Sequence, residues 1–189
     1  MMYNLKFTYY PHPTLREKSE PIQLKDGAPP EEILDLLRRM KRVCLEYDGI
    51  GLAAQQVGLV LPVAVVGRKI RRGEKGDIGD YKLIGVVNPK ILAQSTEILW
   101  REEGCLSFPG LYFEVPRPAW IVVRAWFDDT KKVEDRRLEM MDARVAYHEI
   151  DHLSGILFID RIDEVARAKI RKELKRIARE HPEQVPIEI

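Results

Sequence analysis

The middle of the chain constrains the fold most, because from about residue 59 to residue 140 apolar, β-branched segments alternate with turn signals. Such segments favour strands. Those expected to form strands are 59–70, 82–92, 96–100, 119–129 and 131–140. Trp100, Trp120 and Trp126 lie in or beside them, where packing in the core is the favoured interpretation.

Helices are expected on both sides of this block. Residues 31–48 carry apolar side chains at helical spacing, and the ranges 142–154 and 163–181 have helix-capping residues at their starts. Strands gathered in the middle, with helices before and after, indicate an α+β fold rather than a doubly wound one. We expect central antiparallel or mixed sheets packed around the second helix, with one helix towards each end of the chain.

Length and charge narrow the classes of function. The 189 residues favour one domain over 1–189, and 31 basic residues nearly balance 30 acidic ones, so no overall charge marks a nucleic-acid binder. We find no segment apolar enough to cross a membrane. The two cysteines, Cys44 and Cys105, do not make a disulfide framework, which favours a reducing compartment such as the cytoplasm.

The second expected helix contains the sequence HEIDH at 148–152. Positions four apart share one face of a helix, so His148 and His152 can offer imidazole nitrogens to a single metal ion. Glu149 is turned to one side, where it can reach a water bound to that metal. The competing interpretation is a chance pattern on a solvated, charged helix.

A hydrolytic metal site usually has three protein ligands and one open position. The best third donor is Cys105 in EEGCLSFPG, although a lone cysteine is by itself more typical of a buried core position. A downstream carboxylate, Glu164 or Glu173, would instead give a zinc peptidase of the thermolysin kind. A closed structural zinc site in a non-catalytic, ribosome-binding protein would need a fourth ligand such as Cys44.

The segment GIGLAAQQVG at 49–58 is a third feature of interest. Gly49 and Gly51 permit a tight backbone or a close approach by another segment, and a packed turn after the first helix would explain them. A turn does not explain Gln56, whose amide suits a hydrogen bond to a carbonyl oxygen that becomes an oxyanion.

The three segments GIGLAAQQ, EGCLS and HEIDH, in this order, resemble the signature motifs of the peptide deformylase family, and the resemblance covers most of the chain. It implies a metallohydrolase that removes the formyl group from the N-terminal formylmethionine of nascent chains and releases formate. Cys105, His148 and His152 would then bind one divalent metal ion, Fe²⁺ natively, with Zn²⁺, Ni²⁺ or Co²⁺ as substitutes.

The same resemblance implies roles for the neighbouring residues. Glu149 would be the general base and then the general acid, while Gln56 and the backbone N–H of Leu106 would hold the developing oxyanion. The substrate is expected to contact Gly51, Gly104, Leu106 and Val145, with Val145, Leu106 and His148 forming an apolar pocket for the methionine side chain.

The chain departs from the family pattern at two places. Tyr147 stands where the family usually has glutamine, which affects the surroundings of the ligands rather than the reaction. Leu111 and Tyr112 stand where some relatives carry a basic residue that contacts the peptide.

The third expected helix is strongly basic: residues 161–181 hold eight Lys or Arg against four acids. A solvated face that keeps the protein soluble is the common explanation of such a run. The alternative is a surface that meets ribosomal RNA or protein through salt-sensitive phosphate contacts, as similar helices do in some deformylases.

Overall fold

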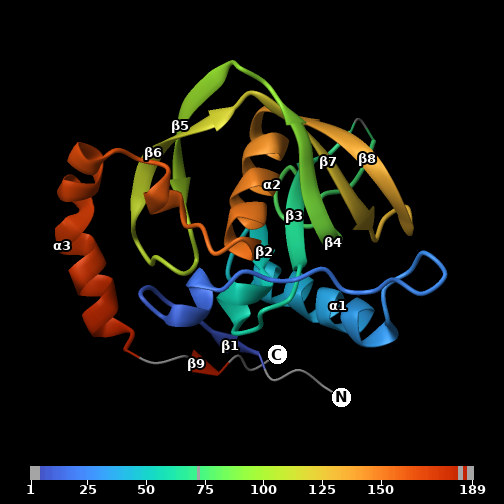
Figure 1. Ribbon diagram of the computed structural model, residues 1–189, viewed down its shortest axis with the longest axis horizontal. Helices are drawn as coiled ribbons and strands as arrows, with labels where there is room; N and C mark the ends of the chain where they lie inside the picture. The colour runs from blue at the N-terminus through green and yellow to red at the C-terminus, as the bar shows by residue number, and fades with distance from the viewer. Residues whose placement is uncertain (1–4, 72, 183–184, 187–189) are drawn as a thin grey trace.

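The computed structural model describes residues 5–71, 73–182 and 185–186. It has an α+β fold in which every paired strand is antiparallel, as expected from the sequence (Figure 1). The main sheet has the order β2-β3-β4-β7-β8. Its strands are β2 (Gly51–Ala53), β3 (Val63–Lys69), β4 (Tyr81–Gln94), β7 (Trp120–Phe127) and β8 (Lys132–Glu139).

The other elements surround this sheet. Two further antiparallel pairs are β5 with β6 and β1 with β9. Their bounds are β5 (Ile98–Gly104), β6 (Tyr112–Pro118), β1 (Lys6–Phe7) and β9 (Val185–Pro186). The helices are α1 (Glu31–Glu46), α2 (Met140–Leu153) and α3 (Glu164–Glu180), with 3-10 turns η1 (Pro13–Arg16), η2 (Ala54–Val57) and η3 (Phe158–Asp160). None of the helices in the described ranges could span a bilayer.

Helix α2 lies between the main sheet and the β5–β6 hairpin (Figure 1). Its apolar side chains, such as Val145 and Ile150, pack on one face of the sheet against Ile84 and Ile121. Helix α1 covers the opposite face, on which Val65 and its neighbours lie. Burial on both faces explains why β3 is an almost continuous apolar run rather than an alternating one.

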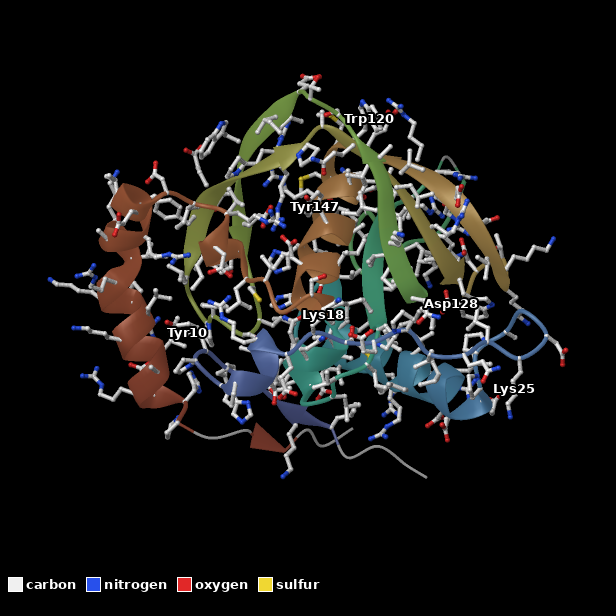
Figure 2. The ribbon with its side chains drawn as sticks, viewed as in Figure 1. Tyr10, Lys18, Lys25, Trp120, Asp128 and Tyr147 are labelled. Atoms are coloured by element: carbon white, nitrogen blue, oxygen red, sulfur yellow. The ribbon has the colours of Figure 1, made fainter. Side chains whose placement is uncertain are left out.

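The sequence predicted five of the nine strands in the described residues and missed β1, β2, β6 and β9. Strand β6 contains Pro116 and Pro118, which argue against a strand, but β6 lies at the edge of a two-stranded sheet, where proline is tolerated. The interpretation of Trp100 as a core residue was wrong, because its side chain is 59% exposed on β5, whereas Trp126 is buried. Trp120 lies at the start of β7, at the top of the sheet (Figure 2).

The capping residues predicted the start of α3 correctly but not the start of α2. The side chain of Asp163 accepts a hydrogen bond from the backbone N–H of Ala166 and caps α3, as expected. Helix α2 begins at Met140 instead of after Asp142, because β8 leads directly into it. Asp142 accepts a hydrogen bond from the backbone N–H of Lys69 and so ties the start of α2 to β3.

Candidate active site

Helix α2 and the end of β5 bring three metal-ligating side chains together. His148 and His152 lie one helical turn apart on α2, and Cys105 follows directly after β5. One ligand atom from each of the three lies within 4.8 Å of the others, and Cys105 Sγ is 3.3 Å from His152 Nε2. One thiol and two imidazoles form a donor set that suits a divalent transition metal.

The orientation of His148 is fixed by Glu103, the penultimate residue of β5. His148 Nδ1 lies 3.0 Å from Glu103 Oε2. Although burial opposes ionisation, hydrogen bonds from His148 and Arg117 hold the pKa of Glu103 well below its usual range. An ionised carboxylate only accepts hydrogen bonds, so Nδ1 carries a proton and Nε2 is the nitrogen left to face a metal. Although burial opposes protonation, hydrogen bonds to Cys105 and Glu103 raise the pKa of His148 well above its usual value, so the ring holds a second proton that a bound metal would displace.

Glu103 is the first member of a buried charge network that runs beneath the histidines. Arg117 donates two 2.9 Å hydrogen bonds to Glu103, and Arg144 donates another of 2.6 Å. Arg117 also binds Asp151, which in turn binds Arg161. The network ties β5, β6 and α2 together, and it thereby sets the distance between Cys105 and the two histidines.

His152 has a different environment. Burial, followed by the positive charges of His148 and Arg117, holds the pKa of His152 well below its usual range. Its Nδ1 atom is buried without a hydrogen-bond partner among the described residues. The ring is therefore neutral, which is the form that ligates a metal.

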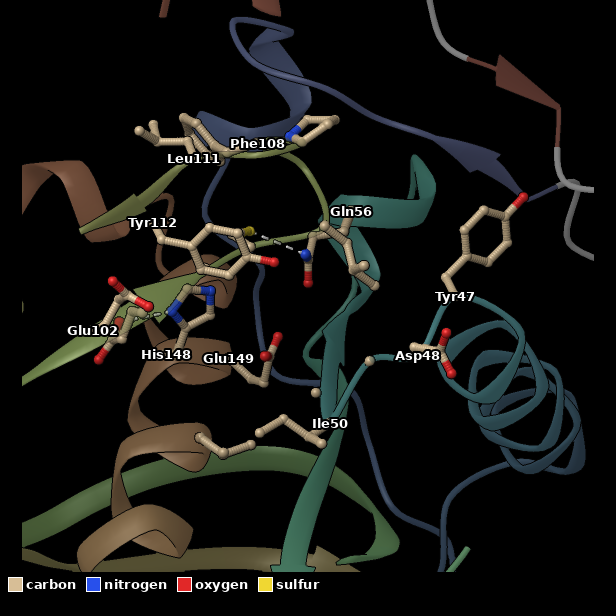
Figure 3. A pocket seen from close by; sticks show the side chains of 18 of the residues that line it. Tyr47, Asp48, Ile50, Gln56, Glu102, Phe108, Leu111, Tyr112, His148 and Glu149 are labelled. Atoms are coloured by element: carbon tan, nitrogen blue, oxygen red, sulfur yellow. Dashed lines mark hydrogen bonds and ion pairs between the residues drawn. The ribbon is translucent and has the colours of Figure 1, made fainter. Parts of the chain in front are cut away.

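Glu149 lies beside the three ligands and points into the same space (Figure 3). It is 4% exposed, and its Oε2 atom has no hydrogen-bond partner within the described part of the chain. Burial, partly offset by His148, raises the pKa of Glu149 to about 7. A Cβ atom at Gly51 would come within 2.3 Å of Glu149 Oε1, so glycine at this position makes room for the carboxylate.

Gln56 faces the ligands from the opposite side (Figure 3). Its Oε1 atom accepts a 2.7 Å hydrogen bond from the backbone N–H of Ala53, which fixes the side-chain amide. The Nε2 atom is then directed at Cys105 Sγ, 3.3 Å away. A donor held in this way is preorganised for an oxygen that gains negative charge.

Cys105, His148, Glu149 and Gln56 line one cavity of about 460 Å³. Every residue expected to contact substrate (Gly51, Gly104, Leu106 and Val145) also lines it. Tyr47 and Tyr112, both exposed, lie at its rim. Cys105, Gln56 and Glu149 therefore share an open cavity with an apolar wall, a setting for hydrolysis of a small acyl group on a peptide.

Sequence comparison agrees with this geometry. The family model described as Polypeptide deformylase matches residues 4–168. The chain belongs to the polypeptide deformylase family. Peptide deformylases remove the N-formyl group from nascent peptides, so this protein is a hydrolase, as the three motifs predicted.

Named deformylases match along most of the chain. It is 39% identical over 171 residues to the peptide deformylase of Syntrophobacter fumaroxidans, covering 90% of this chain and 94% of that protein. It is 38% identical over 179 residues to peptide deformylase 1B, chloroplastic/mitochondrial, of Arabidopsis thaliana, covering 95% of this chain and 62% of that longer protein. A crystal structure of plant peptide deformylase PDF1B superposes with a TM-score of 0.80 at 37% identity, covering 100% of this chain and 98% of that one.

The competing ligands considered for this deformylase lie elsewhere. Glu173 accepts a hydrogen bond from Arg176 on the same exposed side of α3. Cys44 is buried in α1, where its thiol donates to the backbone carbonyl of Gly49. Within the described residues, neither these two nor Glu164 joins the group formed by Cys105 and the histidines.

Sequence reasoning missed the supporting residues of the deformylase site. Glu103, Arg117 and Arg144 are all buried and charged. The available signal was alternation along β5, which turns Glu103 inward between the exposed Glu102 and Gly104. Arg117 could not be found in this way, because β6 was not recognised as a strand.

Proposed function

We propose that Cys105, His148 and His152 hold the single divalent metal ion on which this deformylase depends, and that it is Fe²⁺. The proximity of their three ligand atoms, beside an unpartnered Glu149, is the observation that carries the proposal. The donor set alone suits Zn²⁺, Ni²⁺ and Co²⁺ as well, and the resemblance favours iron. Both cysteines are free thiols, which supports a reducing, cytoplasmic location.

Glu149 is the proposed general base and acid. A divalent metal held by these residues would lower the pKa of water towards about 7 and so supply hydroxide at neutral pH. A carboxyl with a pKa of about 7 can take the proton of the attacking water and then donate it to the leaving amine. Because Gly51 has no side chain, it leaves room for the carboxylate of Glu149, which a Cβ atom at this position would displace.

Gln56 and the backbone N–H of Leu106 are the proposed donors to the formyl oxygen. The hydrogen bond between Ala53 and Gln56 Oε1 keeps Nε2 directed into the cavity. Leu106 follows Cys105 in the turn after β5 and lines the same cavity. Two fixed donors would stabilise the oxyanion as charge moves onto it.

The formylmethionyl peptide is proposed to lie along the free edge of β2. Among the described residues this strand pairs only with β3, and alternation along the ladder turns the N–H and C=O of Gly51 away from β3. Gly104 lines the same cavity, and Val145, Leu106 and His148 provide the apolar wall for the methionine side chain. The carbonyl carbon of a formyl group carries only a hydrogen atom, whereas that of other acyl groups carries a larger substituent. The small formyl group would therefore let the reacting carbon approach Glu149.

The test is formate release from a short formyl-Met peptide by protein purified without oxygen, with metal content read on the same sample. Cys105→Ala is expected to lose both metal and activity. Cys44→Ala, which removes the other thiol, is the matched control and should retain both. Metal-loaded wild-type protein that leaves formyl-Met intact and cuts internal peptide bonds would contradict the proposal.

We propose further that α3 associates with the ribosome. Ile170 and Ile177 pack it on the body, and side chains with nitrogen tips project from its far side (Figure 2). Three of the eight basic residues in 161–181, namely Arg161, Arg167 and Arg176, bind groups of the protein itself. The other five are exposed: Lys169, Arg171, Lys172, Lys175 and Arg179.

Replacing these five exposed residues by glutamine should abolish co-sedimentation with ribosomes at low salt and leave deformylation of a free peptide unchanged. Binding by the wild type should weaken steeply as salt is raised. Lys131→Gln with Lys132→Gln is the control, at two exposed positions where the turn after β7 leads into β8. Equal sedimentation of the five-residue variant and the control would refute the association.

A further inference from the structure

Tyr147 lies between Ala146 and the proposed ligand His148 but outside the cavity, and it packs against the apolar cluster between α2 and the main sheet. Its ring is half-buried, and its hydroxyl donates to Gln94 Oε1 at 3.2 Å. Two guanidinium groups lie near the ring: Cζ of Arg117 is 5.0 Å and Cζ of Arg161 is 5.3 Å from its centroid. Figure 2 labels Tyr147 beside α2.

The two arginines belong to a charge network that is unbalanced. Three guanidinium groups (Arg117, Arg144 and Arg161) face two carboxylates, Glu103 and Asp151, so the network carries one excess positive charge. Of the five side chains, only Arg161 is substantially exposed, at 33%. Excess charge that is mostly shielded from water is costly unless another group offsets it.

The face of an aromatic ring is electron-rich and attracts cations within about 6 Å of its centroid. Tyr147 presents its ring to both arginines that bind Asp151. The attraction acts on Arg117, which holds Glu103, and Glu103 in turn holds Nδ1 of His148. A continuous chain of contacts therefore leads from the tyrosine ring to the orientation of one proposed metal ligand.

We propose that Tyr147 is a positioning residue that offsets the excess charge of this network and so fixes Arg117, Glu103 and the ring of His148. The proposal rests on the function proposed above, because a fixed orientation of the His148 ring matters only if His148 binds the metal. It also explains how a tyrosine serves where the family usually has glutamine: the ring can contact both guanidinium groups at once.

Two substitutions distinguish the contribution of the aromatic ring face from the contributions of the hydroxyl group and of side-chain volume. Tyr147→Phe keeps the face and removes the hydroxyl, whereas Tyr147→Leu fills most of the space without a face. The phenylalanine variant should keep metal affinity and kcat within about twofold. The leucine variant should lose about tenfold to 100-fold in metal affinity, measured by competition with a chelator. Its kcat should fall while KM stays unchanged, because Tyr147 does not line the cavity.

A second readout uses the metal-free protein and so does not depend on catalysis. At a pH high enough for the His148 ring to be neutral, imidazole ¹⁵N shifts should show His148 protonated on Nδ1 in the wild type and the phenylalanine variant, and a mixture of tautomers in the leucine variant. A purely structural role would lower only the melting temperature and leave the tautomer and metal affinity as they are. If the leucine variant does not fold, Tyr147→Met replaces it and is interpreted in the same way.

The outcomes for this proposal and for the proposed function are distinguishable. Wild-type tautomer and metal affinity in the leucine variant, or equal losses in both variants, would overturn the role of Tyr147. Retention of metal by Cys105→Ala would instead overturn the ligand assignment, and the tautomer measurement would still test the link between Tyr147 and His148.

Discussion

In the metal-free protein, Glu149→Gln should gain stability relative to the wild type as the pH rises from acid to neutral, and it should abolish activity once metal is restored. The buried carboxyl has a pKa of about 7, against 4.5 for an ordinary glutamate. Because the folded pKa lies above the unfolded one, the folded state binds more protons between these two values. The stability of the wild type therefore falls as the pH rises through this window.

The magnitude follows from the shift. A change from 4.5 to about 7 is about 2.5 pKa units, which at about 1.36 kcal/mol per unit corresponds to about 3 kcal/mol. Solvent screening does not reduce this figure much, since the side chain is 4% exposed. The amide of glutamine does not titrate, so its own burial cost is the same at every pH and cancels from the pH dependence.

The assay is urea unfolding of metal-stripped wild type and Glu149→Gln at a series of pH values from about 4 to about 8. The difference in free energy of unfolding, variant minus wild type, should grow by about 3 kcal/mol over this range. Glu114→Gln, which removes an exposed carboxylate from β6, is the control and should show no such growth. A difference that is independent of pH would refute the reasoning.

Three other substitutions test the rest of the site. Gly51→Ala places a Cβ atom on Glu149 Oε1, so kcat should fall about 100-fold with metal content unchanged; near-normal turnover would contradict the close approach. Glu103→Gln leaves buried arginines without their counter-charge and should lower the free energy of unfolding by about 3–5 kcal/mol, measured in urea, an effect that a surface position would not show. Val145→Phe should lower kcat/KM for a formyl-Met peptide about tenfold or more and affect a formyl-Ala peptide less, and equal losses would exclude Val145 from the methionine pocket.

The parts of the fold and site that the sequence predicted are those with a local physical cause. Helix α1 follows from apolar spacing, and the shared face of His148 and His152 follows from helical geometry alone. Cys105 has no such local signal and became a candidate ligand because two histidines on one helix face need a third donor, a choice that the order of the three motifs then supported. Its nearness to the histidines is a property of the fold, in which β5 ends beside α2.

The charge network could not be predicted, because its partners are distant in sequence. Arg117 binds Glu103 across 14 residues and Asp151 across 34, and Glu103 meets His148 across 45. Sequence patterns show that such residues are charged, which favours exposure, and only the packing of β5 and β6 on α2 buries them together. The exposed Trp100 is the converse case: its size favours the core, but the outward face of β5 has no element packed on it at that position.

Helix α2 shows how one element can serve both stability and chemistry. Its apolar side chains, including Ala146, Ile150 and Leu153, are buried against the main sheet, where they contribute the favourable burial that holds the helix. On the other side it buries His148 and Glu149, and removing these polar groups from water costs free energy. Helix α2 can carry these unfavourable groups because the sheet already fixes it, so the site gains a carboxyl with a shifted pKa at a rigid place.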